Sequence, residues 1–274
     1  MPVLLVPTDF SAPAANAIHF AAYVAGRAGA AIHLLHIFQV PQDYSAPTTG
    51  IDVGFLPATG TTIPIETMKA AADEDMKLHA QSFIDAYPGI SFTVATRLGG
   101  SFTDAINEYA ADIAPIGIVM GAHPLEGLDS LVGSTTISIT RHLRCPVIAV
   151  PEQYTAGEAS GILLAIDHEP VPNASADMLS QLARLLRAKV SVIHVKTGNE
   201  DAPPVPSSLD GPLLYTVVDD SDVTSGLLSY LQHNPVAFLA VLPHHHNLWS
   251  RLFGKQHTRE LVLQLAVPVL CLPG

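Results

Sequence analysis

The chain is poor in charge, and basic residues are the scarcer kind. Charged residues make up 14% of its 274 residues, with 13 lysines and arginines against 25 aspartates and glutamates and a formal net charge of −12. Disorder needs high charge and low hydrophobicity, whereas 48% of these residues are hydrophobic. Nucleic acids and anionic membranes are bound through basic surfaces. The composition therefore predicts globular domains with buried cores, and it argues against nucleic acid or membrane as a partner.

Long apolar runs and cysteines are also scarce. No apolar stretch approaches the roughly 18–20 residues of a membrane-spanning helix. The first apolar run has no basic segment ahead of it and is interrupted early by Asp9, so we expect a strand and not a signal peptide. Cys145 and Cys271 lie in or beside apolar strand-like runs, which favours buried thiols in a reducing compartment. We therefore expect a cytoplasmic protein.

The sequence templates of common enzymes are missing. No Gly-x4-Gly-Lys-Ser/Thr occurs, because Gly254-Lys255-Gln256 lacks both the upstream glycine and the hydroxyl, and there is no Gly-x-Ser-x-Gly. Asp9 with His36 or His123 would make an acid–base pair. A carboxylate at a strand end is more simply a ligand-orienting group or a helix cap. No catalytic residue is therefore assigned, and slow ATP hydrolysis is left open.

What the chain does have is an alternation of apolar, strand-length runs with helix-period segments. In the first half we expect strands near 3–8, 31–38, 91–97, 116–121 and 146–150, and helices near 13–27, 66–86, 102–111 and 134–143. In the second half we expect strands near 161–166, 189–195, 213–218, 237–242 and 268–272, and helices near 174–187, 222–232 and 256–265. Runs that are apolar on both faces, such as 116–121, are typical of a parallel sheet covered by helices on both sides.

The two halves read as copies of one unit. Asp167 follows Asp9 by 158 positions (167 minus 9), whereas Pro268 follows Pro146 by only 122 (268 minus 146), so the second copy is 36 residues shorter. The helix near 66–86 has no counterpart, because residues 201–208 have loop chemistry. We predict a first domain over 1–152 and a second, degenerate domain over 160–274.

Each copy has an aspartate where its first strand ends, and the carboxyl edge of a parallel sheet is where open α/β folds bind ligands. In the first half a glycine-rich segment follows the strand near 116–121 and leads to Gly133-Ser134-Thr135, which opens a helix. Exposed N–H groups and hydroxyls at that helix start are suited to phosphate. The alternative is a set of turn glycines with an ordinary helix cap.

These segments together resemble the universal stress protein family in its tandem two-domain form. The resemblance covers nearly the whole chain and is carried by Pro7-Thr8-Asp9-Phe10-Ser11, Leu34-Leu35-His36, the loop from Gly121 to Ser134, and Arg144-Cys145-Pro146-Val147-Ile148-Ala149-Val150-Pro151. It implies an α/β fold with two tandem, open, parallel five-stranded sheets flanked by helices, Rossmann-like and of the adenine nucleotide alpha hydrolase type. It also implies an internal pseudo-dimer paired through the last strands, near 147–150 and 269–272; a homodimer is left open.

Many members of the family bind ATP through a Gly-x2-Gly-x9-Gly-Ser/Thr loop. The resemblance implies ATP or ADP as the ligand of the first half. It assigns to the nucleotide site Asp9, the backbone near Ile37, Gly121, Gly127, Gly133, Ser134 and Thr135. The loop departs from the pattern, because Pro124 replaces the second glycine and only eight residues separate it from Gly133. It is therefore shorter and stiffer than the family's loop.

The corresponding segment of the second half, 243–255, keeps only Gly254, so this half is not expected to bind ATP. Arg251, Lys255 and Arg259 recur every four residues, which fits an anion site, a partner's carboxylates or a solvated helix face. The adjacent histidines His244-His245-His246, even with His257, do not predict a metal site, because consecutive extended side chains point in opposite directions.

The sequence thus predicts a regulatory stress-response protein whose first half binds ATP or ADP. The alternative is a scaffold or interaction protein whose nucleotide sites are vestigial. In either case the protein partner is not identified.

Overall fold

The computed structural model describes residues 1–39, 64–122, 139, 145–155, 161–198, 203–204, 209, 213–242 and 267–273. Its strands are β1 (Val3–Thr8), β2 (Ala31–Phe38), β3 (Phe92–Leu98), β4 (Gly117–Ala122), β5 (Val147–Pro151), β6 (Ile162–Ile166), β7 (Val190–Lys196), β8 (Leu214–Asp219), β9 (Phe238–Val241) and β10 (Val269–Cys271). Its helices are α1 (Ala12–Ala28), α2 (Ile65–Ala86), α3 (Phe102–Ile113), α5 (Asn173–Leu186) and α6 (Val223–His233).

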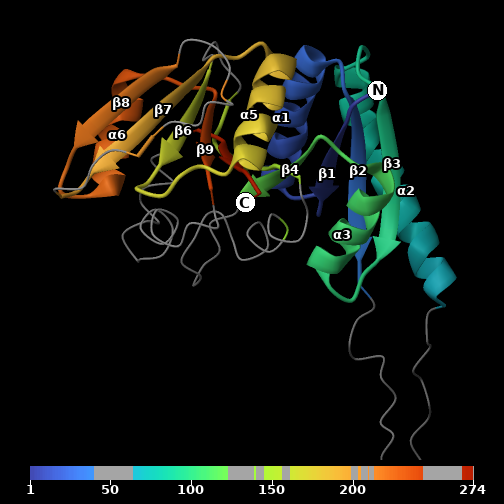
Figure 1. The fold of residues 1–274 in the computed structure, drawn as a ribbon. Helices are drawn as coiled ribbons and strands as arrows, with labels where there is room; N and C mark the ends of the chain where they lie inside the picture. The colour runs from blue at the N-terminus through green and yellow to red at the C-terminus, as the bar shows by residue number, and fades with distance from the viewer. Residues whose placement is uncertain are drawn as a thin grey trace, which may run out of the picture.

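All ten strands belong to one sheet, in the order β3-β2-β1-β4-β5-β10-β9-β6-β7-β8 (Figure 1). Every neighbouring pair is parallel except β5 and β10, which pair antiparallel with Leu270 opposite Ile148. The predicted α/β class is confirmed. The two predicted five-stranded sheets are, however, continuous with each other, because the last strand of each half pairs with that of the other.

Expected and observed elements agree to within about two residues wherever the structure describes them. The expected helices 134–143 and 256–265 lie largely or wholly outside the described residues. The residues between β7 and β8 lie largely outside the described ranges, so the missing counterpart of α2 stays a prediction. No helix in the described ranges is both long and apolar enough to span a membrane.

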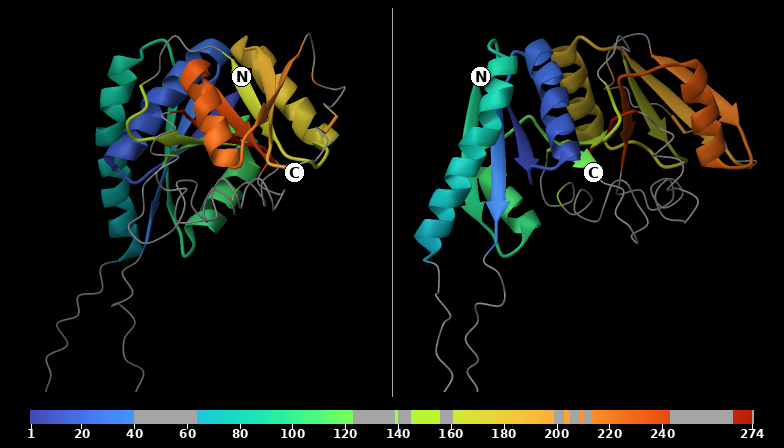
Figure 2. Two further views of the ribbon diagram at one scale, coloured as in Figure 1. Left: turned by 90° about the vertical axis from the view of Figure 1, so that its left-hand side faces the viewer. Right: turned by 180° about the vertical axis from the view of Figure 1, so that it is seen from behind.

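Helices cover both faces of the sheet (Figure 2). One apolar core lies under α1, α2 and α5 and contains the alternate strand residues Leu4, Ile32 and Leu164. The other lies under α3 and α6 and contains Leu5 and Leu163. Successive strand side chains point to opposite faces, so strands buried on both sides need the continuous apolar runs seen in the sequence. Both cysteines belong to the second core, and burial raises the pKa of the Cys145 thiol to about 12.

Equivalent contacts recur in the two halves at the same spacing of 158 positions. The Nδ1 atom of His36 lies 2.9 Å from the carbonyl oxygen of Thr8, and that of His194 lies 3.1 Å from the carbonyl oxygen of Ile166. Helices α1 and α5 both end in a left-handed residue, at Gly29 and at Arg187. The halves thus share strand order and local geometry, while the domain limits themselves stay a prediction.

The pairing of β5 with β10 makes a direct stability prediction. Leu270 lies in the centre of this pairing and is 0% exposed, whereas Leu214 on the edge strand β8 is 63% exposed. We expect Leu270→Ala to lower the free energy of unfolding by about 2–5 kcal/mol, because it removes buried methyl groups and leaves a cavity. Leu214→Ala serves as the matched control and should change it by less than about 0.5 kcal/mol. Urea unfolding curves measure both, and equal shifts would contradict the pairing.

Candidate functional site

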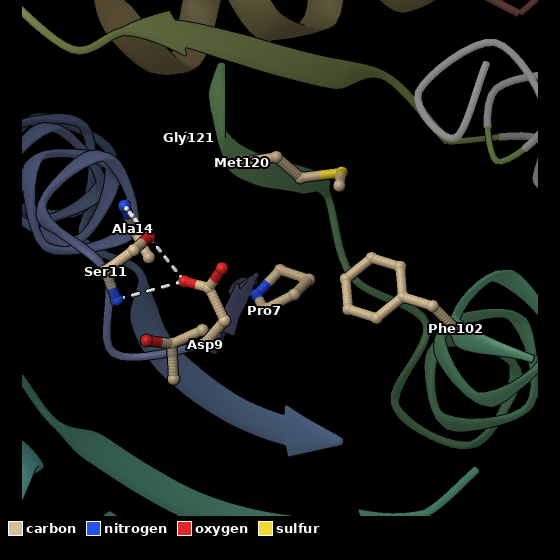
Figure 3. A pocket seen from close by; sticks show the side chains of 8 residues that line it. Pro7, Asp9, Ser11, Ala14, Phe102, Met120 and Gly121 are labelled. Carbon is tan, nitrogen blue, oxygen red and sulfur yellow. Dashed lines mark hydrogen bonds between the residues drawn. The ribbon is translucent and has the colours of Figure 1, made fainter. Parts of the chain in front are cut away.

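A pocket lies where the strand order changes direction. Helix α1, which connects β1 to β2, covers one face, and α3, which connects β3 to β4, covers the other. The carboxyl ends of β1 and β4 therefore form the crevice at which open α/β sheets bind ligands. The pocket at this position is lined by Pro7, Thr8, Asp9, Ser11, Ala14, Phe102, Met120 and Gly121 (Figure 3). Its volume is about 80 Å³, which is small beside the roughly 300–1,000 Å³ of typical ligand sites.

The carboxylate of Asp9 is held by the start of α1. The backbone N–H of Ser11 donates to Asp9 Oδ1 at 3.0 Å, and the Ser11 hydroxyl donates to the same oxygen (Figure 3). Ser11 is also the N-cap of α1, because its Oγ accepts from the N–H of Ala14 at 3.3 Å. The side chain of Asp9 is exposed. The cap thus orients the carboxylate, which lines the pocket.

Gly121 is required by packing. A Cβ built on it would lie 2.5 Å from the carbonyl carbon and oxygen of Pro13 and 2.9 Å from the nitrogen of Ala14. The first turn of α1 therefore rests directly on the backbone of β4. The same absence of a side chain gives the pocket a backbone wall, so this glycine fits both a structural role and a close approach by a ligand.

The structure brings some of the predicted site residues together. Asp9 and Gly121 line the pocket, and Ile37 lies on the neighbouring strand β2 without lining it. Ile37 instead packs against the β3–α3 turn, where a Cβ on Gly99 would come within 2.7 Å of its Cγ2. Gly127, Gly133, Ser134 and Thr135, together with Pro124, lie outside the described residues, so their predicted role stays a prediction.

Sequence reasoning missed an aromatic cluster on the other side of the β1 end. Phe10 has a left-handed backbone, with φ at 67°, and its ring stacks on His36 at 4.3 Å between centroids. The ring of His79 on α2 meets Phe10 edge-on at 4.8 Å. The Nε2 atom of His79 is buried without a hydrogen-bond partner. The cluster connects α2 to the turn that carries Asp9. It forms because Phe10 adopts a left-handed backbone conformation, which the sequence does not reveal.

The equivalent aspartate of the second half is enclosed. The N–H of Glu169 donates to Asp167 Oδ1 at 2.9 Å, which repeats the turn made by Asp9. Asp167 is only 9% exposed, however, and its Oδ2 is buried with no hydrogen-bond partner. The histidines and the basic residues between positions 243 and 259 lie outside the described residues. At the strand end itself, Asp167 is less accessible to a ligand than Asp9.

The chain is similar to known proteins of one family. The model of the universal stress protein family matches residues 1–151. The crystal structure of a universal stress protein from Archaeoglobus fulgidus DSM 4304 has a TM-score of 0.65 at 16% identity, covering 98% of this chain and 97% of that one. A putative universal stress protein from Pseudomonas aeruginosa UCBPP-PA14 has a TM-score of 0.55 at 17% identity, covering 99% and 93%. No curated protein matches the chain. At these identities the solved structures show the fold.

Substitution of Gly121 tests its structural role. We expect Gly121→Ala to destabilise the protein by about 1–3 kcal/mol, because the new methyl group must push α1 away from β4. Gly100→Ala is the control, since a Cβ there meets no atom within 4 Å. Thermal unfolding of the two ligand-free variants measures the difference. A stable Gly121→Ala protein would show that α1 is free to move.

His79 makes the stability of the protein depend on pH. Burial, and then the charge of His36, lowers the pKa of His79 from 6.5. The imidazole of His79 therefore binds a proton less readily in the folded chain than in the unfolded chain. The contribution of neutral His79 to the free energy of unfolding is fully present above pH 6.5 and is lost as the pH falls through the lowered pKa. His79→Phe keeps the ring contacts and should reduce the loss of stability between about pH 7 and pH 5. Urea unfolding of the unmodified chain over the same pH range is the reference, and equal pH profiles for the two proteins would contradict the prediction.

Proposed function

The chain belongs to the universal stress protein family, and on this premise we propose that its first half is a regulatory unit that binds ATP or ADP. The observation that supports this most is the position of Asp9, a capped but exposed carboxylate in the crevice between β1 and β4. Its oxygens can accept hydrogen bonds from ribose hydroxyls or from the amino group of adenine.

The described pocket accommodates only part of such a ligand. Its volume of about 80 Å³ is enough for a fragment of a nucleoside, and the backbone wall at Gly121 lets that fragment approach β4. We propose that the phosphates extend toward Gly127, Gly133, Ser134 and Thr135, as the glycine-rich segment predicts. Ile37 would contribute through its backbone at the adenine edge.

We further propose that the halves are copies of one unit with divided roles. The common strand order, the shared spacing of 158 positions and the pairing of β5 with β10 support this arrangement. In the second half, the burial of Asp167 disfavours a nucleotide at the equivalent strand end. The first half would then act as the nucleotide sensor and the second as its structural partner.

A scaffold or interaction protein with vestigial sites is the competing function. The small pocket supports it, and so does the packing role of Gly121, which accounts for that glycine without any ligand. Under this alternative the turn at Asp9 serves only to cap α1.

Calorimetric titration with ATP and ADP distinguishes the two functions. We expect Asp9→Asn, which keeps the acceptor for Ser11 but removes the charge, to weaken binding roughly tenfold or more, since hydrogen bonds to charged groups contribute about 1.5–3 kcal/mol. Asp167→Asn is the matched control and should leave the affinity unchanged. Absence of binding heat from the unmodified chain at millimolar nucleotide would remove the sensor function and leave the scaffold.

A further inference from the structure

A second cavity lies far from Asp9 in the sequence, at the C-terminal end of α5 and the start of β7. It has a volume of about 320 Å³, four times that of the crevice beside Asp9 and within the usual range of ligand sites. Its lining residues are Ser180, Ala183, Arg184, Arg187, Ala188, Lys189 and Val190. Three of these are basic, and the described lining contains no acidic side chain.

The three cations of the lining have no basic residue at the equivalent positions of the first half. The spacing of 158 positions that relates His36 to His194 places Gly26, Gly29 and Ala31 at the points equivalent to the three cations. Both helices end in the same way there, with the cap N–H donating to the carbonyl of Ala25 in α1 and of Ala183 in α5. The backbone is therefore alike in the two halves, while the second half has long cations where the first has small uncharged residues.

Arg187 occupies its position at a conformational cost. It is the C-cap of α5 with φ at 52°, in the left-handed region that glycine adopts freely, as Gly29 does at the end of α1. A C-cap alone would be served better by glycine. Ala114 ends α3 with φ at 43° as well, so what distinguishes Arg187 is its long cationic side chain at the mouth of the cavity.

The helix end does not itself need these cations. Basic side chains often complement the unsatisfied carbonyls at a helix C-terminus. Here Arg27 of α1 already donates to the carbonyl oxygen of Leu186, through Nε at 3.3 Å and Nη2 at 3.2 Å. The backbone N–H groups of Arg187 and Ala188 donate to the carbonyls of the preceding turn at 3.1 and 2.9 Å. Within the described parts of the chain, neither Arg187 nor Lys189 forms a salt bridge.

We propose that this cavity is an anion-binding site for a small soluble compound that carries phosphate or carboxylate groups. The guanidinium of Arg187 suits bidentate binding of such groups, and Lys189 adds a second positive charge at the same opening. The net charge of −12 repels extended anionic surfaces, whereas a concave cavity presents its cations to a compact ligand. The site is independent of nucleotide binding at Asp9.

The test is a calorimetric titration of the full chain with inorganic pyrophosphate and with citrate. The double variant Arg187→Gly and Lys189→Ala restores the residues of the first half, and we expect it to weaken binding of at least one probe roughly tenfold or more. Because glycine suits the left-handed cap, the thermal midpoint of Arg187→Gly should not fall, so lost binding would not reflect unfolding. The double variant Lys69→Ala and Lys77→Ala, which removes two exposed lysines of α2, is the charge-matched control and should bind as the unmodified chain does.

Three outcomes would overturn the proposal. The first is no saturable binding of either probe at about 10 mM, far weaker than the micromolar range of specific sites. The second is equal affinity in the double variant and the unmodified chain. The third is sedimentation with vesicles of anionic phospholipid without binding of the free probes, which would assign the cations to a membrane surface instead.

Discussion

The antiparallel pairing of β5 with β10 is the interaction on which the architecture depends. Both strands are buried along their whole lengths, and each would otherwise be the exposed edge of a five-stranded sheet. An apolar strand with unpaired backbone groups is a site of aggregation. By pairing with each other, the two edges satisfy their hydrogen bonds within one chain. The remaining strands and helices are then arranged about this central pair.

The candidate site depends on a second close contact, that of α1 with β4. Because Gly121 lets the first turn of α1 touch the strand, Ser11 is brought to the position where it both caps the helix and holds Asp9. The stacking of Phe10 on His36 of β2 holds the same turn on the side away from β4. The geometry of the pocket is therefore a product of packing, and the carboxylate is oriented before any ligand arrives.

Most strands of this fold can be predicted from the sequence, because buried parallel strands are continuous apolar runs bounded by Asp, Gly or Pro. The strand-end position of Asp9 follows from the same pattern, as does the place of Gly121 at the end of β4. The contact of His79 with Phe10 does not, because it joins residues 69 positions apart through a left-handed turn that a phenylalanine rarely adopts. The basic cavity could be found by comparing Gly29 with Arg187 at equivalent positions of the two halves. That comparison requires knowing that both residues are C-caps, which the structure shows.

The core beneath α1 and α5 couples the stability of the two halves. Phe20 of α1 meets Phe238 of β9 edge-on at 5.6 Å, and Arg27 bonds to the end of α5, so apolar and polar contacts both cross between the halves. Segments that share a core tend to unfold as one cooperative unit. A molecule bound anywhere on the native chain would then stabilise all of it by mass action, including the half that it does not touch.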